Sequence, residues 1–197
     1  ASDGVQSAQD LLSPPRRALS AMLGNKRPCM KLRSERIARG NRFTTITGAA
    51  AVATALLVDQ ISKAAVFATF SPGDELILAP FLSILPGWNE GTAFGLANGI
   101  APWLLVAVAL VISGWLVILL IKSSSMSEAF GLGAAIGGAL ANVIDRLRFE
   151  AVRDFIDIHW DAYHWPTFNA ADMFVVGGLL LFVLADLRRQ KEAPGPR

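Results

Sequence analysis

Aspartates recur in and beside the apolar segments of this sequence, where charged side chains are unusual. Asp59 and Asp145 lie in long apolar runs or at their ends, Asp154 and Asp157 follow the second of these runs, and Asp172 opens another. An ionisable group inside a bilayer costs about 2.5–3.5 kcal/mol on insertion scales, so its presence there points to a function. Two carboxylates held close together at low dielectric constant cannot both ionise easily, and they share a proton. The ionised partner can take a proton from water while the protonated one polarises a carbonyl, which is aspartic-protease chemistry.

Two of these aspartates also have a structural interpretation as members of ion pairs. Asp59 and Lys63 are four residues apart, so on a helix they lie on one face and can pair. For Asp59 this structural role is the favoured interpretation. Asp145 stands next to Arg146, and the two are interpreted as a possible salt bridge at the membrane interface.

Asp172 has a structural alternative of a different kind. Asn169 followed three residues later by Asp172, just before an apolar run, is the pattern of a helix capping box. A carboxylate in the first turn is also favoured by the helix dipole. From local sequence alone, capping and catalysis are equally open for Asp172.

A metal site is a competing possibility near the second pair of aspartates. His159 and His164 are five residues apart, with Asp157 and Asp161 close by. That spacing does not place both imidazoles on one face of a helix, and the sequence contains no H-E-x-x-H motif. The same stretch carries three aromatic residues, Trp160, Tyr163 and Trp165. An aromatic belt at the membrane interface is therefore favoured, and no metal or other cofactor is predicted.

Four apolar segments must position these residues. The chain has 197 residues, of which 53% are apolar and 17% charged, against about 25% charged in soluble domains. Cys29 is the only cysteine, which excludes an internal disulfide. Segments long and apolar enough to span a bilayer are predicted at about 44–67, 101–121, 126–144 and 170–187. The sequence thus predicts an all-α integral membrane protein, a four-transmembrane-helix bundle.

Residues outside the spans complete the predicted organisation. The Pro- and Gly-containing segment 71–99 is expected to form a small extracytoplasmic β-sheet, with short strands near 75–78 and 81–85. In the third span, Gly133 and Gly137 form a small-xxx-small pair that lets helices approach closely. Residues 1–42 are predicted to be a basic, disordered extension, 43–190 the four-span domain and 191–197 a tail.

Positive charge predicts the orientation of the spans. Half of the 18 lysines and arginines precede Phe43, and with four spans both termini fall on one side, the cytoplasmic one. The basic extension could bind nucleic acid, but beside an apolar helix it is better interpreted as contacting anionic lipid. Few basic residues remain for the outer side: Lys63, Arg146, Arg148 and Arg153. In this topology the unusual polar residues all gather toward the outer membrane face.

Five motifs in order along residues 44–190 resemble the lipoprotein signal peptidase (signal peptidase II) family. They are Asp59-Gln60-Ile61-Ser62-Lys63, Asn89-Glu90-Gly91-Thr92-Ala93-Phe94, Gly137-Gly138 through Asn142-Val143-Ile144-Asp145-Arg146, Val152-Arg153-Asp154-Phe155, and Phe168-Asn169-Ala170-Ala171-Asp172. Each alone is weak, whereas five in the right order on a four-span frame are highly specific. Residues 1–42 exceed the family's usual start, and Trp88 stands where the family often has a basic residue.

The resemblance implies an aspartic endopeptidase of the bacterial inner membrane, with its site at the outer face. It would act on prolipoproteins, cutting before a cysteine that carries diacylglycerol. The resemblance assigns catalysis to Asp154 and Asp172, with Asp157 as the rival of Asp154. It assigns substrate contacts to Asn89, Asn142 and Arg146, and support to Asp59, Lys63, Asp145 and Asn169. The expected partners are these prolipoproteins and membrane lipids, without nucleic acid, and the enzyme is expected to be a monomer.

Two other classes of function compete with this interpretation. A small proton-coupled transporter or relay could use the same acidic residues, but it would need them near the midplane and would be expected to show an internal repeat. Here the acids lie toward one end of the spans, and the two halves show no repeat. A non-catalytic membrane scaffold would explain the glycines but gives the acids no purpose.

Overall fold

A computed structural model describes residues 27–91 and 102–192 of the chain. The chain divides into two compact units, residues 1–40 and 41–197. In the first unit the described residues, 27–40, are all helical. The second unit contains the four apolar spans, the sheet and every candidate site residue.

The described residues include four helices that are long and apolar enough to cross a membrane, as predicted. The helices are α2 (Arg27–Thr69), α3 (Pro102–Lys122), α4 (Met126–Phe149) and α5 (Ala170–Glu192). In α2 the candidate span is Arg42–Thr69. In α4, 67% of its apolar 18-residue window is buried inside the protein, whereas in each of the other three spans the buried share is 22% or less. Helix α4 is therefore the central helix of the unit.

Two helix boundaries differ from the sequence-based expectations. Helix α2 begins at Arg27, so residues 27–42, which were expected to be disordered, are helical, while residues 1–26 lie outside the described part of the chain. The reason is composition: this stretch contains five arginines together with Lys31, Leu32 and Met30, all good helix formers, and Pro28 falls in the first turn, where proline is tolerated. Helix α4 continues to Phe149, past the predicted end near 144, so Asp145 and Arg146 are helical residues.

Glycines let α4 lie against its neighbours at backbone distance, as their spacing predicts. A methyl group at Gly133 would collide with the carbonyl oxygen of Gly48 in α2. At Gly138 it would collide with the carbonyl oxygen of Ala171 in the first turn of α5. This second contact fixes the start of α5 against α4.

The sheet is larger than the sequence predicts. Its four antiparallel strands, in the order β1-β2-β3-β4, are Leu76–Ala79, Leu82–Asn89, Val152–Trp160 and Tyr163–His164. Strands β1 and β2 correspond to the two predicted strands, whereas residues 152–164 were interpreted as loop and aromatic belt. The charged residues of β3 obscured its β-forming Val, Phe, Ile and Trp, and its main pairing partner, β2, is remote in sequence.

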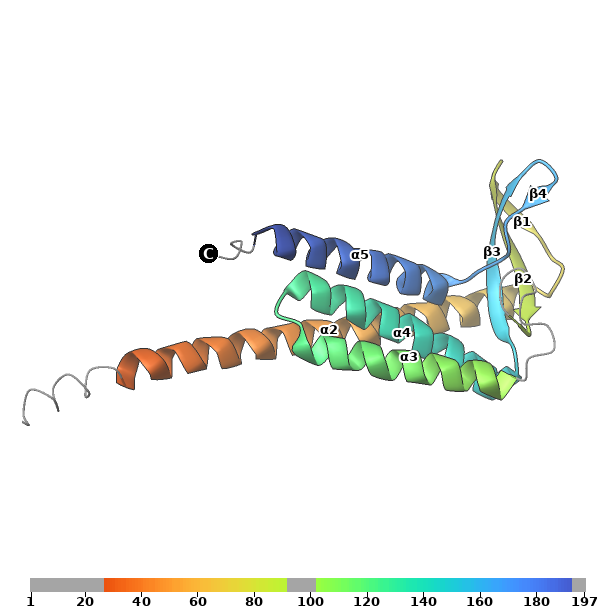
Figure 1. Cartoon of the computed structure of the whole chain (residues 1–197). Helices are drawn as coiled ribbons and strands as arrows, with labels where there is room; N and C mark the ends of the chain where they lie inside the picture. Colours follow the sequence, from red (N-terminus) through yellow and green to blue (C-terminus); the bar gives the residue numbers. More distant parts are fainter. Residues whose placement is uncertain (1–26, 92–101, 193–197) are drawn as a thin grey trace, which may run out of the picture. The chain divides into compact units, whose positions relative to one another are not determined.

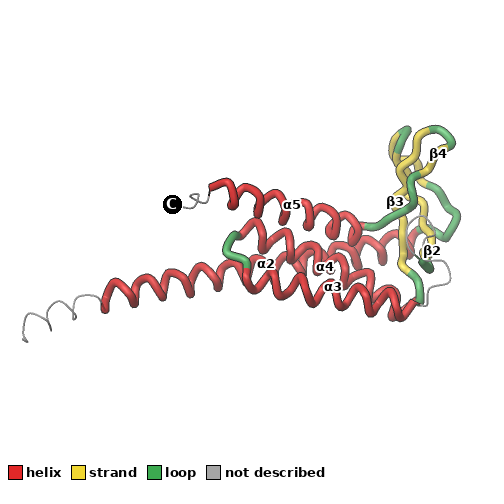
Figure 2. The backbone as a smooth tube through the Cα atoms, in the orientation of Figure 1, coloured by secondary structure: helices red, strands yellow, loops and turns green. Residues whose placement is uncertain are grey.

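The sheet lies at one end of the helices, where α2 and α4 finish and α3 and α5 begin (Figures 1 and 2). After α4, Glu150 adopts a left-handed conformation with φ 58°, and the chain turns directly into β3. The segment returning to α5 folds back on β3, because the carbonyl oxygen of Phe168 accepts hydrogen bonds from the amides of Phe155 and Ile156 at 3.0 and 2.8 Å. The beginning of α5 is thereby held beside the first half of β3.

Candidate active site

A cavity of about 750 Å³ opens at the sheet end of the helices. Its polar lining includes five residues that the sequence singled out: Asn89 of β2, Asn142 and Arg146 of α4, Asp154 of β3 and Asp172 of α5. Much of the remaining wall is apolar, with Phe168, Met173 and Val176 among its members. Four separate elements therefore supply polar groups to one cavity.

Asp154 is buried, with 2% of its surface exposed, and is held by two amides. Asn169 Nδ2 donates to Asp154 Oδ1 at 2.6 Å, and Asn89 Nδ2 donates to Asp154 Oδ2 at 2.9 Å. Burial, with a further contribution from the charge of Asp172, raises the pKa of Asp154 to about 6, although both amide hydrogen bonds and the charge of Lys63 act in the opposite direction.

Asp172 lies in the first turn of α5 and takes part in the predicted capping box. The amide of Asn169 donates to Asp172 Oδ2 at 3.2 Å, and the amide of Asp172 donates to Asn169 Oδ1 at 3.1 Å. The second carboxylate oxygen, Oδ1, accepts a hydrogen bond from Asn142 Nδ2 at 2.8 Å. The same carboxylate lines the cavity, so capping does not withdraw it from the site.

The two carboxylates share an environment of neutral donors. Asn169 contacts both of them, one through its side-chain amide and the other through the reciprocal cap. Among the described residues, neither Asp154 nor Asp172 forms an ion pair with Lys or Arg. Two carboxylates that face one cavity without a direct ion pair favour retaining a proton between them, while the charge of Arg146 on the same wall acts on both at longer range. This is the arrangement that activation of water between two aspartates requires.

A buried ion network lies behind the two carboxylates. Lys63 is 0% exposed, and its Nζ lies 2.7 Å from Asp59 Oδ2 and 3.2 Å from Asp145 Oδ2. The same ammonium donates to Asn142 Oδ1 at 2.9 Å, which orients the Asn142 amide group toward Asp172. The predicted Asp59–Lys63 pair is thus present, as part of a larger cluster.

Asp145 pairs with Arg153, not with its sequence neighbour Arg146. Arg153 Nη2 lies 2.8 Å from Asp145 Oδ1, and its backbone amide donates to Asp145 Oδ2 at 3.1 Å. Consecutive residues of a helix do not face each other, which is why the suggested Asp145–Arg146 salt bridge does not form. Arg146 instead reaches the carbonyl oxygen of Gly91 at 3.3 Å.

Sequence reasoning gave no role to two residues of this network. The side chain of Arg153 links β3 to α4 through Asp145, and Gln60 Nε2 donates to Asp145 Oδ1 at 3.1 Å. Both residues lie inside the five motifs named above. The signal that could have indicated a role for Arg153 is its position beside Asp154 in a stretch of β-forming residues. Asp157, the rival of Asp154, is absent from the cavity lining and contacts His159 and His164.

The family model described as signal peptidase (SPase) II matches residues 51–188. A lipoprotein signal peptidase of Thermodesulfovibrio yellowstonii is 40% identical over 134 residues, which cover 68% of this chain and 90% of the relative. One of Anaplasma phagocytophilum is 34% identical over 152 residues, covering 75% and 96%. A solved bacterial membrane enzyme superposes with a TM-score of 0.67 at 28% identity, covering 77% of this chain and 93% of that one.

We predict that Lys63→Met destabilises the protein by about 3–5 kcal/mol, because it leaves Asp59 and Asp145 buried with less compensating charge. The measurement is thermal or denaturant unfolding of the purified protein in detergent. Lys122→Met, at an exposed position that ends α3, is the matched control and should change stability by less than about 0.5 kcal/mol. Adding Asp59→Asn to Lys63→Met should recover part of the loss. Equal stability of Lys63→Met and the wild type would contradict the network's role.

Proposed function

This chain belongs to the signal peptidase II family, and from that premise we propose that it cleaves diacylglyceryl-modified bacterial prolipoproteins immediately before the lipidated cysteine. Family membership makes it an aspartic peptidase of lipoprotein processing, and its four apolar helices fit a multi-pass membrane protein. The observation that carries the finer proposal is the joint environment of Asp154 and Asp172, two carboxylates on one cavity that are held by asparagine amides and joined through Asn169.

In the proposed reaction the two aspartates divide the proton transfers. Asp154, whose pKa is raised by burial, holds the shared proton and donates it to the oxygen of the scissile carbonyl. Asp172 takes a proton from water as the water oxygen attacks the carbonyl carbon. Asp172 then gives that proton to the amide nitrogen as the C–N bond breaks, and the hydroxyl derived from the carbonyl returns its proton to Asp154. The products are a carboxylic acid and a free amine. The pair of Asp154 and Asp172, called the dyad below, returns to its starting protonation state.

Substrate contacts are proposed for Asn89, Asn142 and Arg146, which line the cavity beside the dyad. Among the described residues Arg146 donates one side-chain hydrogen bond, to the carbonyl oxygen of Gly91, so its guanidinium retains donors for a peptide carbonyl. The amides of Asn89 and Asn142 each bond a carboxylate, so a substrate that they contact is held directly against the dyad. The apolar part of the wall suits a signal peptide or an acyl chain.

Asp59, Lys63, Asp145 and Asn169 are proposed as positioning residues. All four are fully buried, and the first three form the ion network that fixes Asn142. Asp59 also accepts a hydrogen bond from the amide of Ala171 at 2.8 Å, one residue before Asp172. Asp59, Lys63 and Asp145 therefore act on the dyad through other residues, whereas Asn169 donates a hydrogen bond to Asp154 directly.

We place the enzyme in the bacterial inner membrane as a monomer, with both termini in the cytoplasm and the dyad at the outer face. The distribution of positive charge supports this orientation, because the basic N-terminal extension and the C-terminal tail fall together on one side. A lipid-anchored cysteine holds the scissile bond near the membrane surface, which suits a dyad at the end of the spans.

Asp154→Asn and Asp172→Asn should each lower the rate of cleavage by about 10²–10⁴-fold or more, because each removes one proton-transfer group. The assay incubates purified protein in detergent with a diacylglyceryl-modified prolipoprotein. Asparagine keeps an acceptor oxygen and nearly the same shape, so unfolding midpoints and capture of uncleaved substrate should largely persist. Asp161→Asn, an exposed position in the turn after β3, should cleave normally. Full activity in either dyad variant would remove that residue from the mechanism.

The raised pKa of Asp154 predicts the sign of a pH dependence. Because the mechanism needs a proton on this group, kcat/KM should fall as pH rises through about 6, where the free enzyme loses that proton. In kcat, which reports the enzyme–substrate complex, the corresponding fall should lie at higher pH, because bound substrate buries the dyad further. Both parameters are measured from initial rates across a pH series. A kcat/KM that rises through pH 6 would instead require an ionised Asp154 and would reverse the two roles.

Orientation can be measured in a Cys29→Ser background, which has no other cysteine. Ala162→Cys, exposed in the turn between β3 and β4, should react with a membrane-impermeant maleimide added to intact spheroplasts. Lys122→Cys, exposed at the opposite end of α3, should react only after the membrane is broken. The reverse pattern would overturn the proposed topology without affecting the chemistry of the dyad.

A further inference from the structure

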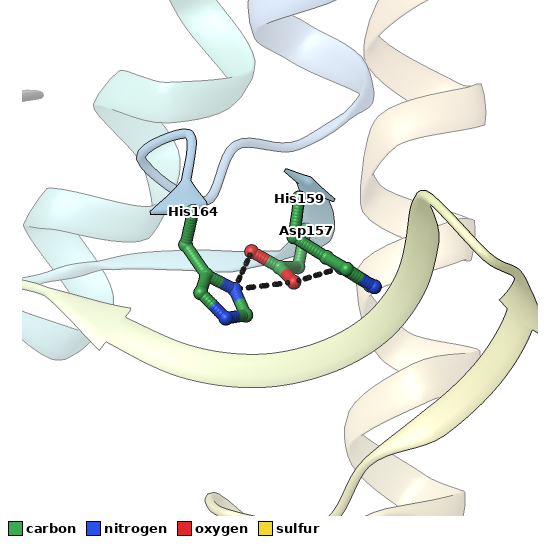
Figure 3. Close-up of side chains that lie close together, drawn as sticks. All are labelled: Asp157, His159 and His164. Carbon is green, nitrogen blue, oxygen red and sulfur yellow. Dashed lines mark hydrogen bonds and ion pairs between the residues drawn. The ribbon is translucent and has the colours of Figure 1, made fainter. Parts of the chain in front are cut away.

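A second cluster of chemically active side chains lies on the sheet, outside the cavity of the dyad. Asp157 and His159 are two residues apart on β3 and therefore project to the same face. His159 pairs with His164 across the antiparallel β3–β4 ladder, and the two imidazole centres are 5.1 Å apart. Figure 3 shows the carboxylate of Asp157 lying between the two rings. A hairpin, not a helix, brings together two histidines whose sequence spacing does not suit one helical face.

We propose that Asp157, His159 and His164 form a binding site for a late first-row divalent cation such as Zn²⁺. One potential ligand atom from each residue lies within 4.8 Å of the others. The Nδ1 atoms of His159 and His164 are both 2.9 Å from Asp157 Oδ2. Zn²⁺ bonds of about 2.0–2.2 Å in tetrahedral geometry separate ligand atoms by about 3.3–3.5 Å. A small opening of these contacts would therefore admit the ion.

The charge of Asp157 favours a cation at this position. Its side chain is 1% exposed, and within the described parts of the chain its ion-pair partners are the two imidazoles alone. Two imidazole nitrogens and a buried carboxylate oxygen therefore converge on one point, which is the donor arrangement that a divalent cation requires. Ser83, which pairs with Asp157 across the β2–β3 ladder, donates from Oγ to Glu75 Oε1 at 2.8 Å. A second carboxylate thus adds negative charge near the same face.

The donor set determines which cations fit. Two imidazole nitrogens and one carboxylate suit Zn²⁺ and its transition-metal neighbours, whereas Mg²⁺ and Ca²⁺ prefer oxygen donors. Three protein ligands leave a fourth tetrahedral position for water. The side chain of His164 is 51% exposed, which gives the ion access from solvent. Backbone hydrogen bonds from His159 to Phe81 and from Trp165 to Ile158 hold the strands on either side of the site, so the ligands are largely preorganised.

The position of the site indicates a structural role. Asp157 is three residues beyond Asp154 on β3, and side chains at that spacing project to opposite faces of a strand. The cation would join β3 to β4 and stiffen the strand that carries Asp154 without facing the cavity. The proposed peptide hydrolysis has no step at this ion. The metal-site proposal can therefore fail without affecting the proposed role of the dyad, and the reverse also holds.

The test uses full-length protein purified in detergent without a polyhistidine tag, stripped with a chelator and then titrated with ZnCl₂ against a chromophoric zinc indicator at pH 7.5. Wild-type protein should bind one Zn²⁺ per chain and unfold at a higher temperature with Zn²⁺ than with Mg²⁺. His159→Ala, His164→Ala and Asp157→Asn should each weaken Zn²⁺ binding at least tenfold. His164→Ala is the most informative of the three, because the exposed side chain can be removed with little effect on packing.

Matched controls separate this site from other sources of zinc affinity. Asp161→Asn removes an exposed carboxylate from the adjacent turn, and Cys29→Ser removes the only thiol, so both should bind Zn²⁺ like the wild type. Size-exclusion profiles and unfolding midpoints without metal verify that each variant is folded. Absence of stoichiometric binding by the wild type would overturn the proposal, as would wild-type affinity in folded His159→Ala and His164→Ala. Loss of binding in Cys29→Ser alone would assign the zinc to the thiol and overturn it too.

Discussion

The ammonium group of Lys63 imposes the constraint on which the rest of the site depends. A fully buried positive charge among apolar helices requires negative partners on several sides, and it obtains them from Asp59 on its own helix and Asp145 on α4. Asp145 in turn binds Arg153 of β3, and Asp59 binds the amide of Ala171 in α5. Satisfying one set of charges therefore fixes three helices and the sheet relative to one another at the end where the cavity lies.

The amide groups of two asparagines transmit this arrangement to the two cavity-facing carboxylates. Asn142 accepts a hydrogen bond from the ammonium and donates one to Asp172, whereas Asn169 donates to Asp154 and caps the helix that begins with Asp172. Amides can orient a carboxylate without neutralising it. Charged partners form the network behind the cavity, whereas the direct hydrogen-bond donors to the two carboxylates are neutral amides, which favours the sharing of a proton between the two acids.

Sequence separation between interacting residues decides which features can be predicted from the sequence. The four spans, the Asp59–Lys63 pair and the capping box at Asn169 are periodic or local patterns, and each is present in the structure. The pairing of Asn89 with Asp154 joins residues 65 positions apart, which no local rule can supply. Strand β3 was missed because its charges interrupt the apolar alternation. Since its faces were unknown, only the family resemblance, and no pattern in the residues themselves, favoured Asp154 over Asp157.

The reciprocal cap at the start of α5 has a consequence for how the molecule loses function on heating. Helix ends ordinarily fray and re-form without effect, because their residues seldom do chemistry. Here the first turn contains one of the two cavity carboxylates, and the bonds between Asn169 and Asp172 that stop fraying also set the position of that carboxylate. Opening this one turn would separate the two acids while the bundle stays intact. In the proposed mechanism the population of active molecules then depends on this local equilibrium, and we expect inactivation to precede unfolding of the bundle.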